Sequence, residues 1–361
     1  MDFQQLQLNK KSLIAPNNMT KIKDLIKELE FIAPPSLQEG YDNSGLIVGN
    51  QEASVTGVIF CLDSTEDVIQ EAIDRDCNLV IAHHPIVFSG LKRFTGSDYV
   101  QRSIIHAIKN DIAIYAIHTN LDNVLYQGVN EKICQKIGLS NLKILAPKSD
   151  ILSIEICCTN SAADLTKDLN NAVSNNELSG QETNFTCIEG ERQTLIKGQF
   201  PKVLKGLVSN LCNTYQSSIS NGPIFANIHG KSSKIGSGMI GILEEELPVE
   251  DFLHQLKESM ELELIKHTNL STDTIKKVAV CGGAGGFLLS RAIAQGADIF
   301  ITSDYKYHEY FDADNKIIIA DIGHFESEQF TIRLLCDIIS EKFSSFANYC
   351  TSVKTNPVNY F

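Results

Sequence analysis

The stretch Asn78–Phe88, NLVIAHHPIVF, places two adjacent histidines directly after a short apolar run. The run Asn78–Ala82 has the length and the unbroken apolar character of a strand that is buried on both faces of a parallel sheet. Pro85 disfavours the helical conformation for His84, so the chain is expected to enter a loop here. Polar side chains that follow a buried strand lie at the edge where open α/β sheets bind ligands.

The two neighbouring histidines, His83 and His84, suit two metal ions better than one. Successive side chains of a strand point to opposite faces, so the two rings are expected to diverge. The alternative is a pair of hydrogen-bonded histidines with a structural role, since a motif of two residues is a weak signal.

The sequence on both sides of this stretch alternates between strands and helices. Strands are expected at 55–62 and 112–117, and helices from Ser64 or Thr65 to about Arg75 and over about 98–110. That alternation predicts a parallel sheet. The strand at 112–117 ends in HTNLD, which brings His118 and Asp122 to the same edge.

A second segment repeats the pattern, which predicts two similar α/β halves. Strands are expected at 276–281, 297–302 and 316–320, and helices at 287–295 and from about Glu326. The last strand ends close to His324. The turn Gly282–Gly286, GGAGG, follows a strand and opens a helix, so it is expected either to bind phosphate through its backbone N–H groups or to permit close packing.

The middle of the chain has a different order. Strands are expected at 151–159, 182–189, 194–200 and 238–243, and helices at 162–173 and 201–213. This βαββαβ order is typical of a ferredoxin-like α+β domain. We therefore expect an inserted domain at 148–247, a discontinuous α/β metal-binding domain formed by 19–147 and 248–361, and a flexible extension at 1–18.

Composition narrows the class of protein. The 361 residues carry a formal net charge of −13, which argues against nucleic acid or an anionic membrane surface as the main partner. No apolar run approaches the length of a membrane span, and the N-terminus lacks the apolar core of a signal peptide. The ten cysteines form no CxxC pair, so reduced thiols and a cytoplasmic location are expected.

Two carboxylates and a third histidine complete a candidate metal centre. His324 and Glu328 are four residues apart and share one helix face if the helix begins at or before His324. Asp122 closes HTNLD at another strand end. Carboxylates can bridge two ions, whereas each imidazole binds one ion. The alternative is an ordinary helix start with a solvent-facing pair.

Three further residues are candidates for catalytic roles. His118 can orient a ligand or transfer a proton, or it can be a structural histidine at a strand end. Asp304 and His308 are expected to line the same cleft, together with Lys306. Asp42 is expected in a turn near the site.

At these motifs the sequence resembles the Nif-three-like dinuclear-metal proteins, many of which are labelled "GTP cyclohydrolase 1 type 2 homolog". The resemblance runs from about Thr20 to Glu341. It rests on YDNSGLIVGN at 41–50, NLVIAHHPIVF at 78–88, IHTNLD at 117–122, GVN at 128–130, CGGAGG at 281–286, ITSDYKYH at 301–308 and DIGHFESE at 321–328. One departure is Ser303, where the family more often has glycine.

The resemblance implies a ligand set, an assembly and an inserted domain. The two metal ions would be bound by five residues, namely His83, His84, Asp122, His324 and Glu328. The chain would form a ring-shaped homohexamer whose sites face an internal cavity. The middle segment would be an insert similar to the PII and CutA folds, and GSGMIGILEE at 236–245 resembles its closing strand.

The function expected from these features is that of a metal-dependent hydrolase that acts on a small molecule. Two divalent ions would activate a water, and the family label makes a nucleotide such as GTP a candidate substrate. Mixed imidazole and carboxylate ligation predicts zinc, with iron or manganese as alternatives. The competing hypotheses are a regulatory or interaction protein with structural metals, in which the insert senses a ligand, and a metal-storage or metal-insertion protein.

Overall fold

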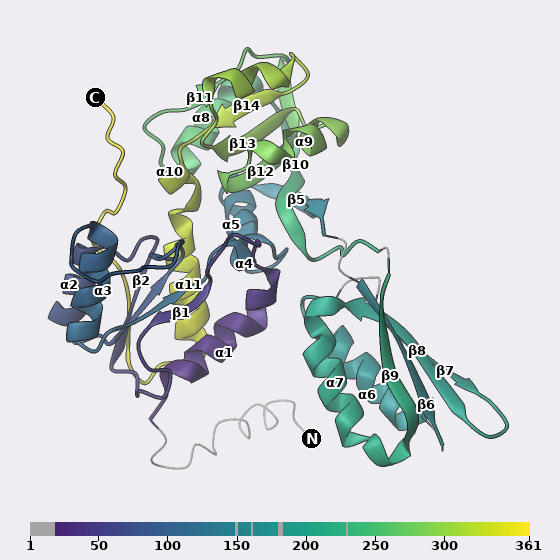
Figure 1. Cartoon of the computed structure of the whole chain (residues 1–361). Helices are drawn as coiled ribbons and strands as arrows, with labels where there is room; N and C mark the ends of the chain where they lie inside the picture. The colour runs from purple at the N-terminus through teal and green to yellow at the C-terminus, as the bar shows by residue number, and fades with distance from the viewer. Residues whose placement is uncertain (1–18, 149–150, 160–161, 180–182, 229) are drawn as a thin grey trace, which may run out of the picture.

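The computed structural model describes residues 19–148, 151–159, 162–179, 183–228 and 230–361. The extension predicted at 1–18 lies outside the described residues. The described residues form three sheets, of five, six and four strands. In Figure 1 the five-stranded and six-stranded sheets lie one above the other, and the four-stranded sheet is set apart from both.

The five-stranded sheet is built mainly from the first half of the chain. Its order is β1 (Gly45–Val48), β4 (Ala113–Ala116), β3 (Leu79–Ala82), β2 (Gly57–Cys61) and β15 (Ala347–Cys350). β4, β3, β2 and β15 are parallel, as the alternation of strands and helices predicts, and β1 is antiparallel to β4.

Helices cover both faces of this sheet because its strands are apolar on both sides. α1 (Ile22–Ile32) and α11 (Phe330–Lys342) share a core with alternate residues of β2, such as Phe60. α2 (Glu66–Asp74) and α3 (Tyr99–Lys109) share another core with the intervening residues, such as Ile59. α2 begins where the sequence predicts, since the Thr65 hydroxyl accepts a hydrogen bond from the N–H of Val68.

The six-stranded sheet contains the second parallel unit. Its order is β11 (Lys266–His267), β14 (Ile318–Asp321), β13 (Ile299–Ser303), β12 (Thr274–Ala284), β10 (Gly236–Pro248) and β5 (Leu139–Pro147). β12, β13 and β14 are parallel. The helices of this half are α5 (Val129–Lys136), α8 (Val249–Ser259) and α9 (Leu289–Ala294).

The four-stranded sheet comes from the middle of the chain and has its own core. Its order is β7 (Asn184–Glu189), β8 (Thr194–Pro201), β6 (Ile151–Cys158) and β9 (Ile219–Ile228), with helices α6 (Ala163–Ser174) and α7 (Lys205–Thr214). The remaining short helices are α4 (Thr119–Asp122), α10 (His324–Glu328), η2 (Pro35–Leu37), η3 (Lys202–Leu204), η4 (Gln216–Ser218), η5 (Gly286–Leu288) and η6 (Tyr307–Ala313).

The strand predicted at 238–243 exists, but its assignment to the inserted domain is wrong. It is part of β10, which pairs antiparallel with β5 and β12, with Met239 opposite both Ile144 and Val280. β9 takes the place of the fourth strand in the small sheet. The apolar pattern of 238–243 specifies a buried strand and leaves its partners open, because pairing depends on the tertiary fold.

The carboxyl ends of the parallel strands of both large sheets converge between the sheets, where α4 and α10 begin (Figure 1). α10 and α11 follow each other in this region, so the second half of the chain reaches across to the first. Within the described residues, no helix has both the length and the apolar character that crossing a membrane requires.

Candidate metal centre

β3 delivers the two histidines to the carboxyl edge of the five-stranded sheet. The backbone remains extended beyond β3, because the N–H of His83 donates to Cys61 O at 3.1 Å and that of His84 to Leu62 O at 2.9 Å. The two imidazole rings are tilted by 45° with centroids 5.0 Å apart. The two rings therefore lie close together, with His84 in the cavity lining and His83 fully buried.

Each of these histidines is held through Nδ1, so Nε2 points towards the carboxylates of the site. The Nδ1 atom of the fully buried His83 lies 2.8 Å from the carbonyl oxygen of Ile117. The Nδ1 atom of His84 lies 2.8 Å from Asp63 Oδ1. A carbonyl or carboxylate oxygen only accepts, so Nδ1 carries the hydrogen in both rings. The Nε2 lone pair is then the one available to a metal.

α10 brings the second pair of predicted ligands into contact with these histidines. The helix begins at His324, and the spacing of four residues places His324 Nε2 3.1 Å from Glu328 Oε2. His84 Nε2 lies 2.9 Å from the same oxygen, whereas His83 Nε2 lies 3.8 Å from Glu328 Oε1. The two oxygens of one buried carboxylate thus face different histidines, which is the arrangement that a bridging ligand needs.

Asp122 completes the group from α4. Its Oδ1 atom lies 3.7 Å from His83 Nε2. Both atoms are buried, and neither has a hydrogen-bond partner among the described residues. Buried polar atoms are rarely left without partners because removing them from water costs free energy. A cation between them would satisfy both, so the residues present fit a metal.

Burial and mutual charge shift the pKa values of these groups strongly. Burial and the nearby Glu328 raise the pKa of Asp122 to about 7. Burial opposes ionisation of Glu328 too, but hydrogen bonds from His324 and His84, together with the charge of the neighbouring His83, outweigh it and hold the Glu328 pKa well below its ordinary value.

The pKa values of His84 and His324 are both raised. Burial alone would lower the His84 pKa, yet hydrogen bonds to Asp63 and Glu328 raise it to about 10. The same competition, through Glu328 and Asp304, raises the pKa of His324 to about 9. Protons on these rings therefore supply the positive charge that the carboxylates require, and a metal would replace them.

His118 lies at the same site. Its Nδ1 atom is 2.8 Å from Asp42 Oδ1, and its ring centroid is 5.3 Å from that of His83 and 5.4 Å from that of His84. Ligand atoms of His83, His84 and His118 all lie within 4.8 Å of one another, and so do those of His84, His324 and Glu328. His118 is thus close enough to act on anything bound there.

The other two candidates for catalytic roles are placed differently. Asp304 lines the cavity, and its Oδ2 atom lies 2.6 Å from His324 Nδ1, so it holds a predicted ligand. The turn forms with Ser303 in place of the family glycine, and Asp304 itself adopts φ 60°. His308 is exposed on η6 with its ring against Tyr307, outside the cavity lining. The expectation that His308 lines the cleft is wrong, because η6 turns it away.

The glycine-rich turn serves close packing. The N–H groups of Gly282, Gly283 and Gly285 donate to side chains, at 3.0, 2.9 and 2.9 Å. A Cβ atom at Gly283 would lie 2.5 Å from Glu328 Oε1. The turn lets Glu328 approach β12, and these three N–H groups are already taken by protein acceptors, so the phosphate-binding alternative finds no support.

Asp63 is the site residue that sequence reasoning missed. It follows β2 at the carboxyl end, and its carboxylate orients His84. The available signal was an acidic residue directly after an apolar strand, at the same sheet edge as His83 and His118.

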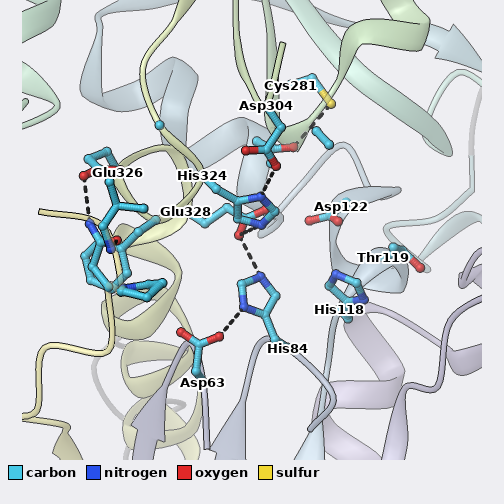
Figure 2. A pocket seen from close by; sticks show the side chains of 18 of the residues that line it. Asp63, His84, His118, Thr119, Asp122, Cys281, Asp304, His324, Glu326 and Glu328 are labelled. Carbon is cyan, nitrogen blue, oxygen red and sulfur yellow. Dashed lines mark hydrogen bonds and ion pairs between the residues drawn. The ribbon is translucent and has the colours of Figure 1, made fainter. Parts of the chain in front are cut away.

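A cavity of about 720 Å³ between the two large sheets is lined by seven of these residues, namely Asp63, His84, His118, Asp122, Asp304, His324 and Glu328. Figure 2 shows His84 between Asp63 and Glu328, His324 between Glu328 and Asp304, and Asp122 and His118 on the opposite side. The volume is within the ordinary range for small-molecule sites.

Comparisons with known proteins identify relatives of the chain. A family model described as Duf34/NIF3 (NGG1p interacting factor 3) matches residues 20–357. A Staphylococcus epidermidis protein named "GTP cyclohydrolase 1 type 2 homolog" is 30% identical over 94% of this chain and 100% of that protein.

Two solved structures are similar over nearly their whole length. A Bacillus cereus protein related to NIF3 gives a TM-score of 0.77 at 27% identity, covering 96% of this chain and 100% of that one. A Staphylococcus aureus protein gives 0.74 at 28% identity, covering 95% and 99%. The chain belongs to the Duf34/NIF3 family.

Proposed function

We propose that the chain binds two divalent metal ions between its two large sheets. His84 and His324 would bind one ion and His83 the other, with the carboxylates of Glu328 and Asp122 shared between the two. The observation that carries this proposal is the buried pair of His83 Nε2 and Asp122 Oδ1, which face each other without hydrogen-bond partners. Imidazole and carboxylate ligands favour zinc, with iron or manganese as alternatives.

The reaction we propose is hydrolysis of a small molecule. Bound divalent ions lower the pKa of water and polarise phosphoryl or carbonyl oxygens. The chain adds His118, whose Nδ1 is held by Asp42, so that its other nitrogen is free to move a proton at the cavity wall. The name of the relatives puts GTP and other nucleotides first among the substrates to test.

Metal analysis and turnover on one sample test this proposal. The full chain is stripped of metal, reloaded separately with zinc, iron(II) and manganese, and assayed on nucleotides and phosphoesters. We expect about two ions per chain and turnover that disappears in His83→Ala. One ion per chain under metal-replete conditions would reject the dinuclear centre. Two ions without turnover on any substrate would reject the hydrolase.

The second candidate function is regulation, and it is favoured by the separate four-stranded sheet. That sheet has its own core and a hollow of about 420 Å³ on its open face, lined by residues such as Glu155 and Lys197. In a regulatory protein the metals would be structural, and a ligand of the small sheet would alter the main site. Tight metal binding without turnover, together with ligand binding to the small sheet, would favour this function.

We also propose that the protein is cytoplasmic and assembles into a toroidal homohexamer, as the family resemblance implies. Sedimentation velocity of the metal-loaded protein measures the assembly directly. A monomer or dimer at micromolar concentration would refute the ring.

A further inference from the structure

The segment Thr351–Tyr360 follows β15 and runs to the metal centre. β15 is parallel to β2, with Cys350 opposite Phe60, so both strands end at the same edge of the sheet. The ladder continues one step further, since the N–H of Thr351 donates to Phe60 O at 2.9 Å. In Figure 1 the yellow C-terminal segment leaves this sheet beside α2 and α3. The topology therefore delivers the segment to the edge where the ligands lie.

The start of the segment is fixed by a buried carboxylate. Glu71 of α2 is 8% exposed and accepts the N–H of Ser352 at 3.0 Å and its hydroxyl at 2.7 Å. The hydroxyl of Thr351 donates to the same carboxylate. Arg75 pairs with Glu71 at 2.9 Å. Four donors on one carboxylate hold the chain in a single path towards the site.

Thr355 then contacts the residue that orients a predicted ligand. Its hydroxyl lies 2.7 Å from Asp63 Oδ2, while Asp63 Oδ1 accepts from His84 Nδ1 at 2.8 Å. A carboxylate with one donor can rotate about its Cβ–Cγ bond, whereas donors on both oxygens fix its plane. The direction of the Nδ1–H bond, and with it the position of His84 Nε2, then depends on Thr355.

The next residue contacts the other half of the centre. The side-chain amide of Asn356 donates to Glu326 Oε1 at 2.9 Å, and Glu326 lies on α10 between His324 and Glu328. Figure 2 shows this interaction at Glu326. Asn356, Pro357 and Val358 also line the cavity. One segment thus touches the supports of ligands from both halves of the chain.

We propose that Thr355 is a positioning residue of the metal centre and acts through Asp63 on His84. The segment Thr351–Asn356 holds Thr355 in place. The inference rests on the proposed metal centre. Loss of an outer contact of a metal-binding histidine typically weakens metal binding tenfold to a hundredfold. Thr355 is one hydrogen bond further from the metal than Asp63, so we expect its loss to weaken metal binding about threefold to tenfold.

Cobalt(II) binding to the metal-free full chain tests the proposal, because its visible absorption reports both affinity and ligand geometry. We expect Thr355→Val to bind cobalt about threefold to tenfold more weakly and with altered bands. Thr355→Ser, which keeps the hydroxyl, is expected to restore both. Thr214→Val, which removes a hydroxyl from α7 of the small sheet, is the matched control and is expected to bind like the wild type.

The same measurement in an Asp63→Ala background separates positioning from general stability. If Thr355 acts through Asp63, the valine substitution has no further effect there. An equal loss in both backgrounds would overturn the inference, as would unchanged binding and bands in Thr355→Val. Wild-type protein that binds no cobalt would instead reject the metal centre itself. If Thr355→Val unfolds at a lower temperature than the wild type, Thr355→Ala is measured in its place.

Discussion

Glu328 is the residue on which three histidines converge, and it is 2% exposed. Its Oε2 atom faces His84 and His324, and its Oε1 atom faces His83. Removal of its charge therefore disturbs both proposed ions, since two neighbouring cations repel each other and anionic ligands offset that repulsion. A single histidine has only one nitrogen to offer in this geometry.

Substitution of the ligands is expected to divide them into two groups. Glu328→Gln or Asp122→Asn should remove both ions after dialysis, because each change removes a buried negative charge at similar size. His83→Ala or His84→Ala should lose mainly one ion, and His118→Ala should keep both. Elemental analysis per chain measures this ranking. Loss of one ion in each of the four ligand variants would contradict the bridging role of the carboxylates. Loss of metal from His118→Ala would show that His118 is itself a ligand.

The raised pKa values of His84 and His324 predict how the metal-free protein responds to pH. At pH 8 the folded chain holds protons that an unfolded histidine, with a pKa of about 6.5, has released. Raising the pH therefore favours unfolding, and this contribution to stability is lost between about pH 7 and pH 10.

Melting temperatures at several pH values check this expectation. The Tm of the metal-free protein should fall from pH 7 to pH 10, and the gain in Tm on adding zinc should grow over the same range, because metal and protons compete for the rings. His84→Gln should flatten the first trend. A metal-free Tm that rises with pH in this window would contradict the assignment.

At the scale of elements, the glycine-rich end of β12 sets how close α10 can come. Gly283 has φ 62°, and a side chain there would meet the Glu328 carboxylate. Gly286 belongs to the same glycine-rich stretch, but its nearest neighbour to an added Cβ lies 3.7 Å away. The two positions thus offer a matched pair for substitution by alanine.

Gly283→Ala is expected to lower zinc affinity at least about tenfold, because it displaces Glu328, and to cost about 1–2 kcal/mol for the left-handed backbone. Gly286→Ala should change neither quantity appreciably. Competition with a chromogenic chelator gives the affinity, and urea denaturation gives the stability. Equal affinities in the two variants would show that the turn does not set the position of Glu328.

The elements that local signals specify were predictable. The start of α2 at Thr65, the buried strands of both halves and the face shared by His324 and Glu328 follow from capping, unbroken apolar runs and helical spacing. Pairing was not predictable where it is non-local. β10 pairs with β5 across the whole middle segment, and β15 adds to β2 from the far end of the sequence.

Among the site residues, predictability followed the strength of the motif. His83, His84, Asp122, His324 and Glu328 stand in patterns, and the structure brings all five together. Asp63 and Thr355 are single polar residues whose importance comes from one contact each. His308 is a residue type that can transfer protons, and it follows a strand that ends near the site. The path of η6 nevertheless places it outside the cavity lining.

At the scale of the molecule, we expect the small sheet to be separable from the metal centre. Its core is formed by residues between Leu152 and Cys212. The two ends of this segment lie next to each other, since the N–H of Ser232 donates to Lys148 O at 3.0 Å. Leu178 and Val203 are hydrophobic side chains of this segment that pack on the main core. A deletion that removes the small sheet should therefore lie between Lys148 and Ser232 and keep both residues.

Replacing 150–230 by a short Gly-Ser linker should leave metal content unchanged, since Lys148 and Ser232 are already adjacent. Removing 148–247 instead should yield insoluble protein, because that deletion takes β10 out of the middle of the six-stranded sheet. Metal per chain and the far-ultraviolet dichroism melt distinguish the two. Loss of metal from the shorter deletion would show that the small sheet belongs to the centre.

The pairing of β15 with β2 bears on how the protein is made. The first sheet lacks one of its strands until synthesis has passed Cys350, and the site lacks a carboxylate until it has passed Glu328. A ribosome-bound chain that already displays His83, His84 and Asp122 therefore has only part of the ligand set. Contacts of such long range also slow folding. Insertion of the proposed ions is accordingly expected only after synthesis has passed Glu328, and chains terminated before that residue should emerge without metal.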